Sequence, residues 1–455
     1  KAEKLYLEAL NLNINSRGEI DENTASSADY LGFIYELMNE YKSAEKYYLM
    51  SIEIRENIYG KKAPELTASL KQLGILLYRD LGRFSEGEKM LLRCLEIVKS
   101  INGKDSFEAI EVNTDLAIIY DSMGDFDKSK TIYESSLQIL EKQYGLNHIA
   151  LVEILEAISR SYSAQGDFFG AEKVLLRALT INENEYGPNH SSSQSLLEIL
   201  ADVYQMGGSY KKSVSVLENL LEEIDVQDSQ FVDFSRSRIM GNLGVVYQTM
   251  GNYNKAEDFL KKSHSLTAKI YGENHPEFLT SLNNLGVLYS LKGDTEAAER
   301  YYTKQLNVRK AFFKEDHLAM AILHSNIGVL YLTIGDLESA EKSTLNAVNI
   351  TKKFYGAGDP RTATFIGNLV VIKEHQGKYD EALKILDSSI SVTKNSLGKN
   401  HPVHVSHLGE KGKLHYIQGQ PEKARDLIKN ALNETIKIYG QKSYPITPML
   451  SKLAN

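Results

Sequence analysis

EFLTSLNNLGVLYSLKG, residues 277–293, is the stretch whose pattern recurs along the chain. Leu285 and Tyr289 are four residues apart, so both lie on one face of a helix. Gly286 stands between them, where a side chain would hold a neighbouring helix away. Gly293 follows as a turn residue, and a second helical segment runs over residues 294–313. The stretch therefore predicts a helix, a tight turn and a second helix.

The turn glycine marks a repeat with a period of 42 residues. The spacing is 43 residues only between Gly208 and Gly251. Asn39 takes the place of the glycine in the first repeat, and asparagine tolerates the left-handed backbone of a helix C-cap better than other non-glycine residues. A small residue five positions after each turn lets the second helix cross closely. The pattern predicts ten helix-turn-helix repeats, with turn glycines at Gly82, Gly124, Gly166, Gly208, Gly251, Gly293, Gly335, Gly377 and Gly419.

An aromatic residue stands four positions before the turn in repeats one to eight, where it should join the core. Lys373 and His415 replace it in repeats nine and ten. The eight aromatic residues are Tyr35, Tyr78, Tyr120, Tyr162, Tyr204, Tyr247, Tyr289 and Tyr331.

The junctions between repeats carry helix-end signals. Many read Tyr-Gly, and several continue as Asn-His-Pro, as at Asn274-His275-Pro276. Glycine ends one helix, a polar residue caps the next, and proline takes its first turn. A row of histidines at this position could also suggest a metal site. We favour capping, because stacked helix pairs set such residues roughly 10 Å apart and metal ligands lie about 2 Å from the ion. The histidines are His148, His190, His275, His317 and His401.

Neither helix of a repeat can bury its apolar stripe alone, so neighbouring repeats must stack into one core. The expected fold is all-α, a right-handed α-solenoid superhelix. Residues 1–21 would be the second helix of a truncated preceding repeat, 22–228 repeats one to five, 229–440 repeats six to ten, and 441–455 the start of a further repeat. The junction at 222–235 is acidic and lacks Tyr-Gly; a longer loop is the simpler interpretation, and a hinge between two arms is the alternative.

The pattern Leu-Gly-x-x-Tyr, a turn glycine and a small residue five positions later resembles the tetratricopeptide signature. The 42-residue period and the Tyr-Gly-x-Asn-His-Pro junction resemble the kinesin light chain variety of this repeat, and the resemblance covers essentially the whole chain. It implies a protein-binding scaffold or adaptor that holds an extended peptide or partner protein in a concave groove. It is specific for the fold and weak for the function.

The resemblance places a peptide-binding face in repeats six to nine. Asn242, Asn284, Asn326 and Asn368 recur at one repeat position, and an asparagine amide both donates to and accepts from a peptide backbone. The first five repeats lack this asparagine but keep the fold signature, which favours a binding role. The alternative is that each asparagine bridges adjacent repeats. The same face would include Arg238, Val245, Thr280, Asn283, Val287, Ser325, Val329 and Thr364.

The matching positions in the first half are mainly acidic. An acidic groove would favour a partner with a basic stretch. The alternative, which the sequence supports equally, is that these charged residues only form a solvent-exposed helix surface. The residues are Asp29, Glu111, Asp115, Glu153, Glu156, Glu198 and Asp202, with Lys71 and Arg160 among them.

Composition excludes several classes of function. The net charge of −8 argues against nucleic acid as the main partner. No apolar run is long enough for a transmembrane helix. The single cysteine, Cys94, should be a core residue and fits a reducing, cytoplasmic setting. The sequence contains no P-loop, dinucleotide fingerprint, HExxH or CxxC motif, so we expect no enzyme activity, no cofactor and no metal site.

Two rival functions remain open at this stage. The chain begins with Lys1 instead of methionine and lacks capping repeats, so it could be the sensor or regulatory arm of a larger enzyme with a protease-like or NTPase domain. It could also be a structural spacer that binds no partner.

Overall fold

The computed structural model describes residues 2–225, 232–273, 275–312, 318–398 and 401–439. Within these ranges the regular structure is entirely helical, so the predicted all-α repeat solenoid is confirmed. Ten helical pairs follow one first helix, α1, in the described residues. The chain divides into two compact units, residues 1–146 and 147–455, which are described separately.

The N-terminal unit contains α1 and the first three repeats. Each helix packs against the next one in the sequence, as expected for a solenoid. The elements are α1 (Ala2–Arg17), α2 (Glu22–Leu37), α3 (Tyr41–Tyr59), η1 (Pro64–Leu66), α4 (Thr67–Ile75), η2 (Leu76–Asp80), α5 (Phe84–Asn102), α6 (Phe107–Ser122) and α7 (Phe126–Tyr144).

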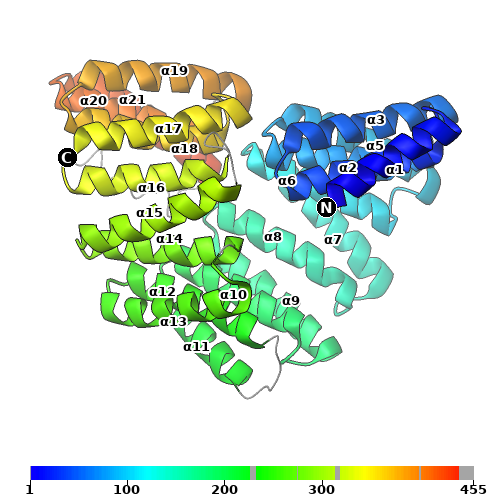
Figure 1. The fold of residues 1–455 in the computed structure, drawn as a ribbon, viewed down its shortest axis with the longest axis horizontal. Helices are drawn as coiled ribbons and strands as arrows, with labels where there is room; N and C mark the ends of the chain where they lie inside the picture. Colours follow the sequence, from blue (N-terminus) through cyan, green and yellow to red (C-terminus); the bar gives the residue numbers. More distant parts are fainter. Residues whose placement is uncertain (1, 226–231, 274, 313–317, 399–400, 440–455) are drawn as a thin grey trace. The chain divides into compact units, whose positions relative to one another are not determined.

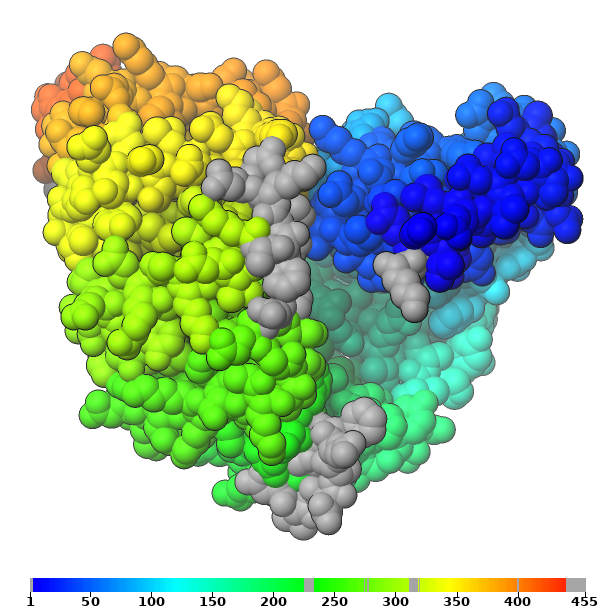
Figure 2. All heavy atoms as spheres, in the orientation of Figure 1, coloured from blue at the N-terminus to red at the C-terminus, as the bar shows by residue number. Residues whose placement is uncertain are grey.

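The C-terminal unit contains repeats four to ten, and its helix pairs stack in sequence order (Figure 1). In the space-filling view its colours run in bands from green through yellow to orange, because each repeat contacts mainly its neighbours (Figure 2). The elements are η3 (Ile149–Leu151), α8 (Val152–Ala164), α9 (Phe168–Tyr186), α10 (Ser191–Met206), α11 (Tyr210–Asp225), α12 (Val232–Thr249), α13 (Tyr253–Tyr271), α14 (Pro276–Leu291), α15 (Thr295–Phe312), α16 (Ala319–Thr333), α17 (Leu337–Tyr355), α18 (Pro360–His375), α19 (Tyr379–Leu397), α20 (Pro402–Ile417) and α21 (Pro421–Tyr439).

The glycines of the signature stand where a side chain has no room or where the backbone is left-handed. A Cβ at Gly286 would lie 2.5 Å from the ring of Tyr302 on the second helix of the same repeat. Gly293 has a φ of 76°, and Asn39, which replaces the turn glycine in the first repeat, has a φ of 58°. Both expectations for these positions are therefore confirmed.

Repeat two carries one residue more than the signature allows, which the sequence reasoning overlooked. Asn39 and Gly82 are 43 residues apart. The first helix absorbs the extra residue in a π-helical turn, η2, where the Leu81 amide donates to the Leu76 carbonyl at 3.1 Å. A π-bulge accommodates one inserted residue without breaking the helix, so the turn and the second helix keep their places.

The signature tyrosine also links adjacent repeats. Its hydroxyl donates to a glutamate on the second helix of the preceding repeat, as Tyr289 does to Glu257 at 2.7 Å. The sequence predicted only a core role for this ring. The same bond joins Tyr35 to Glu3, Tyr120 to Glu88, Tyr204 to Glu172, Tyr247 to Glu218 and Tyr331 to Glu299.

Lys373 takes over this link in repeat nine. Its buried ammonium donates to Glu341 at 2.6 Å and pairs with Glu381 at 2.7 Å. We expect Lys373→Met to lower the free energy of unfolding by about 1.5 kcal/mol, because it removes a hydrogen bond to a charged group. Lys373→Tyr restores the residue of repeats one to eight and should lose much less. Urea unfolding of both variants tests this, and equal stability of the two would contradict it.

The predicted division after residue 228 differs from the boundary between the compact units, which follows Leu146. The repeat assignment of these segments stays a prediction, as does the handedness of the superhelix. Residues 226–231 of the irregular junction and all of 441–455 lie outside the described residues.

Candidate functional site

The four recurring asparagines occupy the same repeat position on the first helices of four consecutive repeats of the C-terminal unit. We call this row of side chains the asparagine ladder, and the surface around it the asparagine face. Asn242 lies on α12, Asn284 on α14, Asn326 on α16 and Asn368 on α18, and all four are half-buried. Each asparagine directly precedes the core leucine or isoleucine of its helix, so its amide lies at the edge of the apolar stripe.

Three of the four asparagines form a hydrogen bond with the preceding repeat. In each case the acceptor is the residue just before the ladder position of that preceding repeat. The Nδ2 of Asn326 donates to Asn283 at 2.7 Å, and that of Asn368 donates to Ser325 at 3.0 Å. The Nδ2 of Asn242 donates to Glu198 at 3.4 Å. The bridging role that the sequence left open as an alternative is therefore present at these three positions. In the described part of the chain, no hydrogen bond reaches their Oδ1 atoms.

Asn284 is the exception, because the residue of the preceding repeat that corresponds to the acceptors of the other bridges is Gly241. Glycine offers no side-chain acceptor, and no described residue forms a hydrogen bond with the Asn284 amide. A small cavity of about 80 Å³ lies at this point. Its lining includes Gly241, Asn242 and Asn284, with the hydroxyl residues Ser237 and Thr280 nearby.

Apart from Arg238, the other predicted site residues fall into three groups: the bridge partners, the threonines and the valines. Asn283 and Ser325 are the bridge partners just described, whereas Thr280 and Thr364 are exposed near the N-terminal ends of α14 and α18. Val245, Val287 and Val329 stand three positions after the asparagines, and Val329 is the most exposed of them. The sequence reasoning missed Val371, which continues this row at the same 42-residue spacing.

Arg238 and Glu198 form an ion pair at the N-terminal end of the ladder. The guanidinium is 2.7 Å from the Glu198 carboxylate, whose side chain is only 6% exposed, whereas Arg238 itself is 41% exposed. Burial raises the pKa of Glu198 to about 7, Asp202 adds to this effect, and Arg238 opposes it. Glu198 therefore belongs to the ladder's bridge to Asn242 more than to an open acidic groove.

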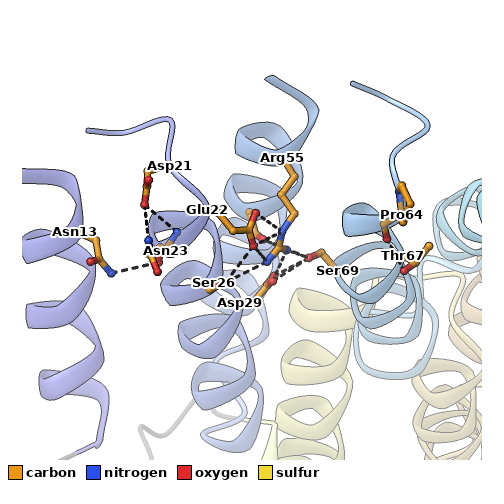
Figure 3. A network of polar contacts seen from close by, with 11 residues as sticks. Asn13, Asp21, Glu22, Asn23, Ser26, Asp29, Arg55, Pro64, Thr67 and Ser69 are labelled. Carbon is orange, nitrogen blue, oxygen red and sulfur yellow. Dashed lines mark hydrogen bonds and ion pairs between the residues drawn. The ribbon is translucent and has the colours of Figure 1, made fainter. Parts of the chain in front are cut away.

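In the N-terminal unit the predicted acidic residues are also engaged internally. Arg55 on α3 points toward Glu22 and Asp29 of α2, and it donates to Ser69 of α4 at 2.6 Å (Figure 3). Ser69 in turn donates to Asp29 at 2.8 Å. This cluster joins both helices of repeat one to repeat two.

Further acidic positions of both units pair with neighbouring cations. Lys71 lies 3.6 Å from Glu111 and 3.8 Å from Asp115. Arg160 pairs with Glu156 on the same helix. These pairs lower the net negative charge available to a partner, and Glu153 and Asp202 remain exposed. Attraction of a basic partner stays a prediction.

The junction histidines cap helices. His148, His190 and His401 each accept a hydrogen bond from the backbone N–H two residues later. His275 stacks on Tyr271 with ring centroids 4.2 Å apart, and His317 lies outside the described residues. In the described ranges no three histidine, cysteine or acidic side chains gather where they could hold a metal ion.

Cys94 is buried, as expected for a core residue, and its Sγ donates to the Thr67 carbonyl. Burial raises the pKa of its thiol to about 11, which keeps it protonated. Among the helices of the described ranges, none combines the length and apolar character that crossing a membrane requires.

Comparison with solved structures finds likeness of fold at low identity. A putative kinesin light chain with nearly identical TPR-like repeats from Podosopora anserina is 20% identical, with a TM-score of 0.38; the alignment covers 44% of this chain and 94% of that one. BtubC (BKLC) from P. vanneervenii is also 20% identical, with a TM-score of 0.40 and coverages of 54% and 92%. A Rap protein complexed with Competence and Sporulation Factor is 15% identical, with a TM-score of 0.47 and coverages of 82% and 98%.

No curated protein matches the sequence. Family models give a direct answer. The model described as "Tetratricopeptide repeat" matches residues 23–99, 65–142, 109–169, 235–311 and 361–433, and a second model of the same description matches 151–192. These stretches cover more than half of the chain. With its helical pairs, which stack within each unit, and the signature residues at their contacts, the chain belongs to the tetratricopeptide repeat family.

Proposed function

We propose that the asparagine face of repeats six to nine binds an extended peptide, or an extended segment of a partner protein. Tetratricopeptide repeats in general bind protein or peptide partners and are not enzymes. The observation that carries the proposal is Asn284, whose half-buried amide meets Gly241 and bonds to no described residue. A polar group in that position gains from a partner, and a peptide backbone supplies both an N–H and a carbonyl.

The bridging role of the other three asparagines supports the same function. Each bridge uses the Nδ2 atom and fixes the orientation of the amide. The Oδ1 atom then remains to accept a peptide N–H. Bridging and binding therefore use different atoms of one side chain, and a preoriented acceptor costs less entropy on binding.

The spacing of the ladder sets a length for the peptide. If each repeat advances by about 10 Å, successive asparagines meet every third residue of a strand that rises about 3.3 Å per residue. Four asparagines then span about ten residues. A peptide shorter than this should lose affinity stepwise as each asparagine is left without its contact.

Alanine substitution tests the proposal. The strongest binder from a display library of ten-residue peptides serves as the probe, measured by isothermal titration with the intact chain. We expect the double variant Asn284→Ala/Asn326→Ala to bind roughly 10-fold to 100-fold more weakly, since each lost hydrogen bond contributes about 1 kcal/mol. Asn433→Ala, an exposed position on α21, is the matched control and should bind normally.

The single variants separate binding from bridging. Asn284→Ala removes no recorded bond within the chain, so it should weaken binding without lowering the thermal midpoint. Asn368→Ala removes the bridge to Ser325 and should lower both. Unchanged affinity in the double variant, with the helical circular dichroism signal intact, would show that the ladder is only a structural bridge.

A further inference from the structure

The C-terminal unit contains a second and larger cavity, which shares helix α16 with the asparagine face but is lined by other residues of that helix. It measures about 300 Å³ and lies among α15, α16 and α17. Tyr302, Tyr331, Ser339 and Ser343 are among the residues that line it, with Lys342 at its exposed rim. This volume is at the lower end of the range for pockets that bind small molecules.

Other repeats show what is missing at this point. In repeats one, six and seven the signature tyrosine is covered by a ring on the following second helix. Tyr289 stacks on Tyr301 with centroids 5.5 Å apart, and Tyr247 stacks on Phe259 at 5.7 Å. In repeat eight the equivalent residue is Ser343, whereas the nine other repeats carry a large apolar or aromatic side chain: Tyr47, Met90, Ile132, Val174, Val216, Phe259, Tyr301, Ile385 and Leu427.

A second serine, Ser339, replaces a lysine that lies over the signature tyrosine in some other repeats. In three repeats a lysine four positions after the turn lies over the tyrosine ring, as Lys255 does over Tyr247 at 4.7 Å. Lys128 and Lys212 do the same. In repeat eight this position is Ser339. In the described part of the chain, Tyr331 makes neither a ring stack nor a cation contact, although its hydroxyl donates to Glu299 at 3.3 Å and holds the ring in place.

The cavity is also lined by a tyrosine whose hydroxyl has no hydrogen-bond partner among the described residues. Tyr302 is 3% exposed, and no described residue forms a hydrogen bond with it. The equivalent tyrosines of two other repeats donate to a carboxylate on the first helix, Tyr48 to Glu36 at 3.0 Å and Tyr133 to Asp121 at 3.2 Å. Ser290 occupies the carboxylate position in repeat seven. The Tyr302 hydroxyl is therefore available to donate to or accept from a bound molecule.

We propose that this cavity binds a small aromatic molecule, such as a phenol or an indole. Its ring stacks on Tyr331 in the place of the ring that Ser343 lacks, and its hydroxyl or N–H bonds to the Tyr302 hydroxyl. Stacked aromatic pairs gain about 0.5–1.5 kcal/mol beyond their buried area, and Tyr302 can either donate or accept. The site is separate from the asparagine face and does not depend on peptide binding there.

The test measures binding of phenol and indole to the intact chain by saturation-transfer NMR and isothermal titration, with cyclohexanol as the non-aromatic probe. We expect both aromatic probes to saturate one site and cyclohexanol to bind at least 10-fold more weakly. Ser343→Tyr, which rebuilds the arrangement of Tyr301, should abolish binding and raise the thermal midpoint. Ser388→Tyr, at an exposed position on α19, is the matched control and should bind like the wild type.

Two further variants keep the test decisive if Ser343→Tyr does not fold. Tyr302→Phe should weaken phenol binding severalfold, and Ser339→Lys should weaken both aromatic probes by covering Tyr331. Absence of saturation in the wild type, or equal affinity in Ser343→Tyr, overturns the proposal. Binding of N-acetyltryptophanamide at least 10-fold tighter than indole also overturns it, because the ring would then belong to a polypeptide partner.

Discussion

Replacement of Arg55 by leucine is expected to lower the free energy of unfolding of the N-terminal unit by about 3 kcal/mol. The side chain is 8% exposed and donates to Glu22, Asp29, Ser51 and Ser69. Leucine would leave two carboxylates without their cation, and Asp29 is held by only Ser69 in that case. The loss exceeds that of one hydrogen bond because Arg55 serves several acceptors at once, and Asp29, which is 25% exposed, is left with a charge that solvent compensates only in part.

Urea denaturation monitored by circular dichroism measures this effect. Arg17→Leu, at an exposed position at the end of α1, controls for the loss of one arginine and should change stability by less than about 0.5 kcal/mol. Since Arg55 joins both helices of repeat one to α4, the variant should also increase hydrogen exchange in α2 and α3. A free energy of unfolding equal to that of the Arg17 control would contradict the assignment.

The second large effect concerns pH and Glu198. The pKa of this carboxyl is about 7 in the folded chain, against an ordinary value of 4.5, chiefly because burial disfavours its charge. Between these two values the folded state binds more protons than the unfolded state, so stability falls as the pH rises. Relative to Glu198→Gln, the wild type should therefore lose roughly 3 kcal/mol between pH 4.5 and pH 8.

Comparison of the two proteins by urea unfolding at several pH values isolates the titration of Glu198 together with its coupling to Asp202, since the titrations of groups that do not interact with Glu198 cancel in the difference. Glu153→Gln, an exposed carboxylate on the neighbouring first helix, is the matched control. A stability difference that stays constant from pH 4.5 to pH 8 would refute the predicted titration. The expected result would mean that the end of the asparagine face changes charge near neutral pH, as Arg238 gains or loses its partner.

Much of the candidate face could be placed from the sequence. The period located Asn242, Asn284, Asn326 and Asn368 on equivalent helices, because residues at one register position of a repeat occupy equivalent places in the solenoid. The row of valines was found in part, and Val371 was overlooked although its spacing is the same. The predicted acidic character of the first half was read from single residues, and the structure pairs most of them with cations that lie elsewhere in the sequence.

The partners of each side chain needed the tertiary structure. Asn326 meets Asn283, 43 residues earlier, whereas Asn284 meets Gly241, and this offset appears only when adjacent repeats are stacked. The link from the signature tyrosine to the preceding repeat likewise joins residues about thirty positions apart. The cavity beside Tyr331 depends on two serines that look unexceptional until their neighbours are known.

The helices, the turns, the number of repeats and the family could be predicted from the amino-acid sequence alone. These follow from local properties: a helical period of apolar residues, left-handed turn residues, N-caps, and small residues where helices cross closely. The three-dimensional packing was needed to see which polar side chains have hydrogen-bond partners and which, such as Asn284 and Tyr302, have none among the described residues. Hydrogen bonds and voids depend on which side chains face each other across a contact, and a one-dimensional pattern does not contain that pairing.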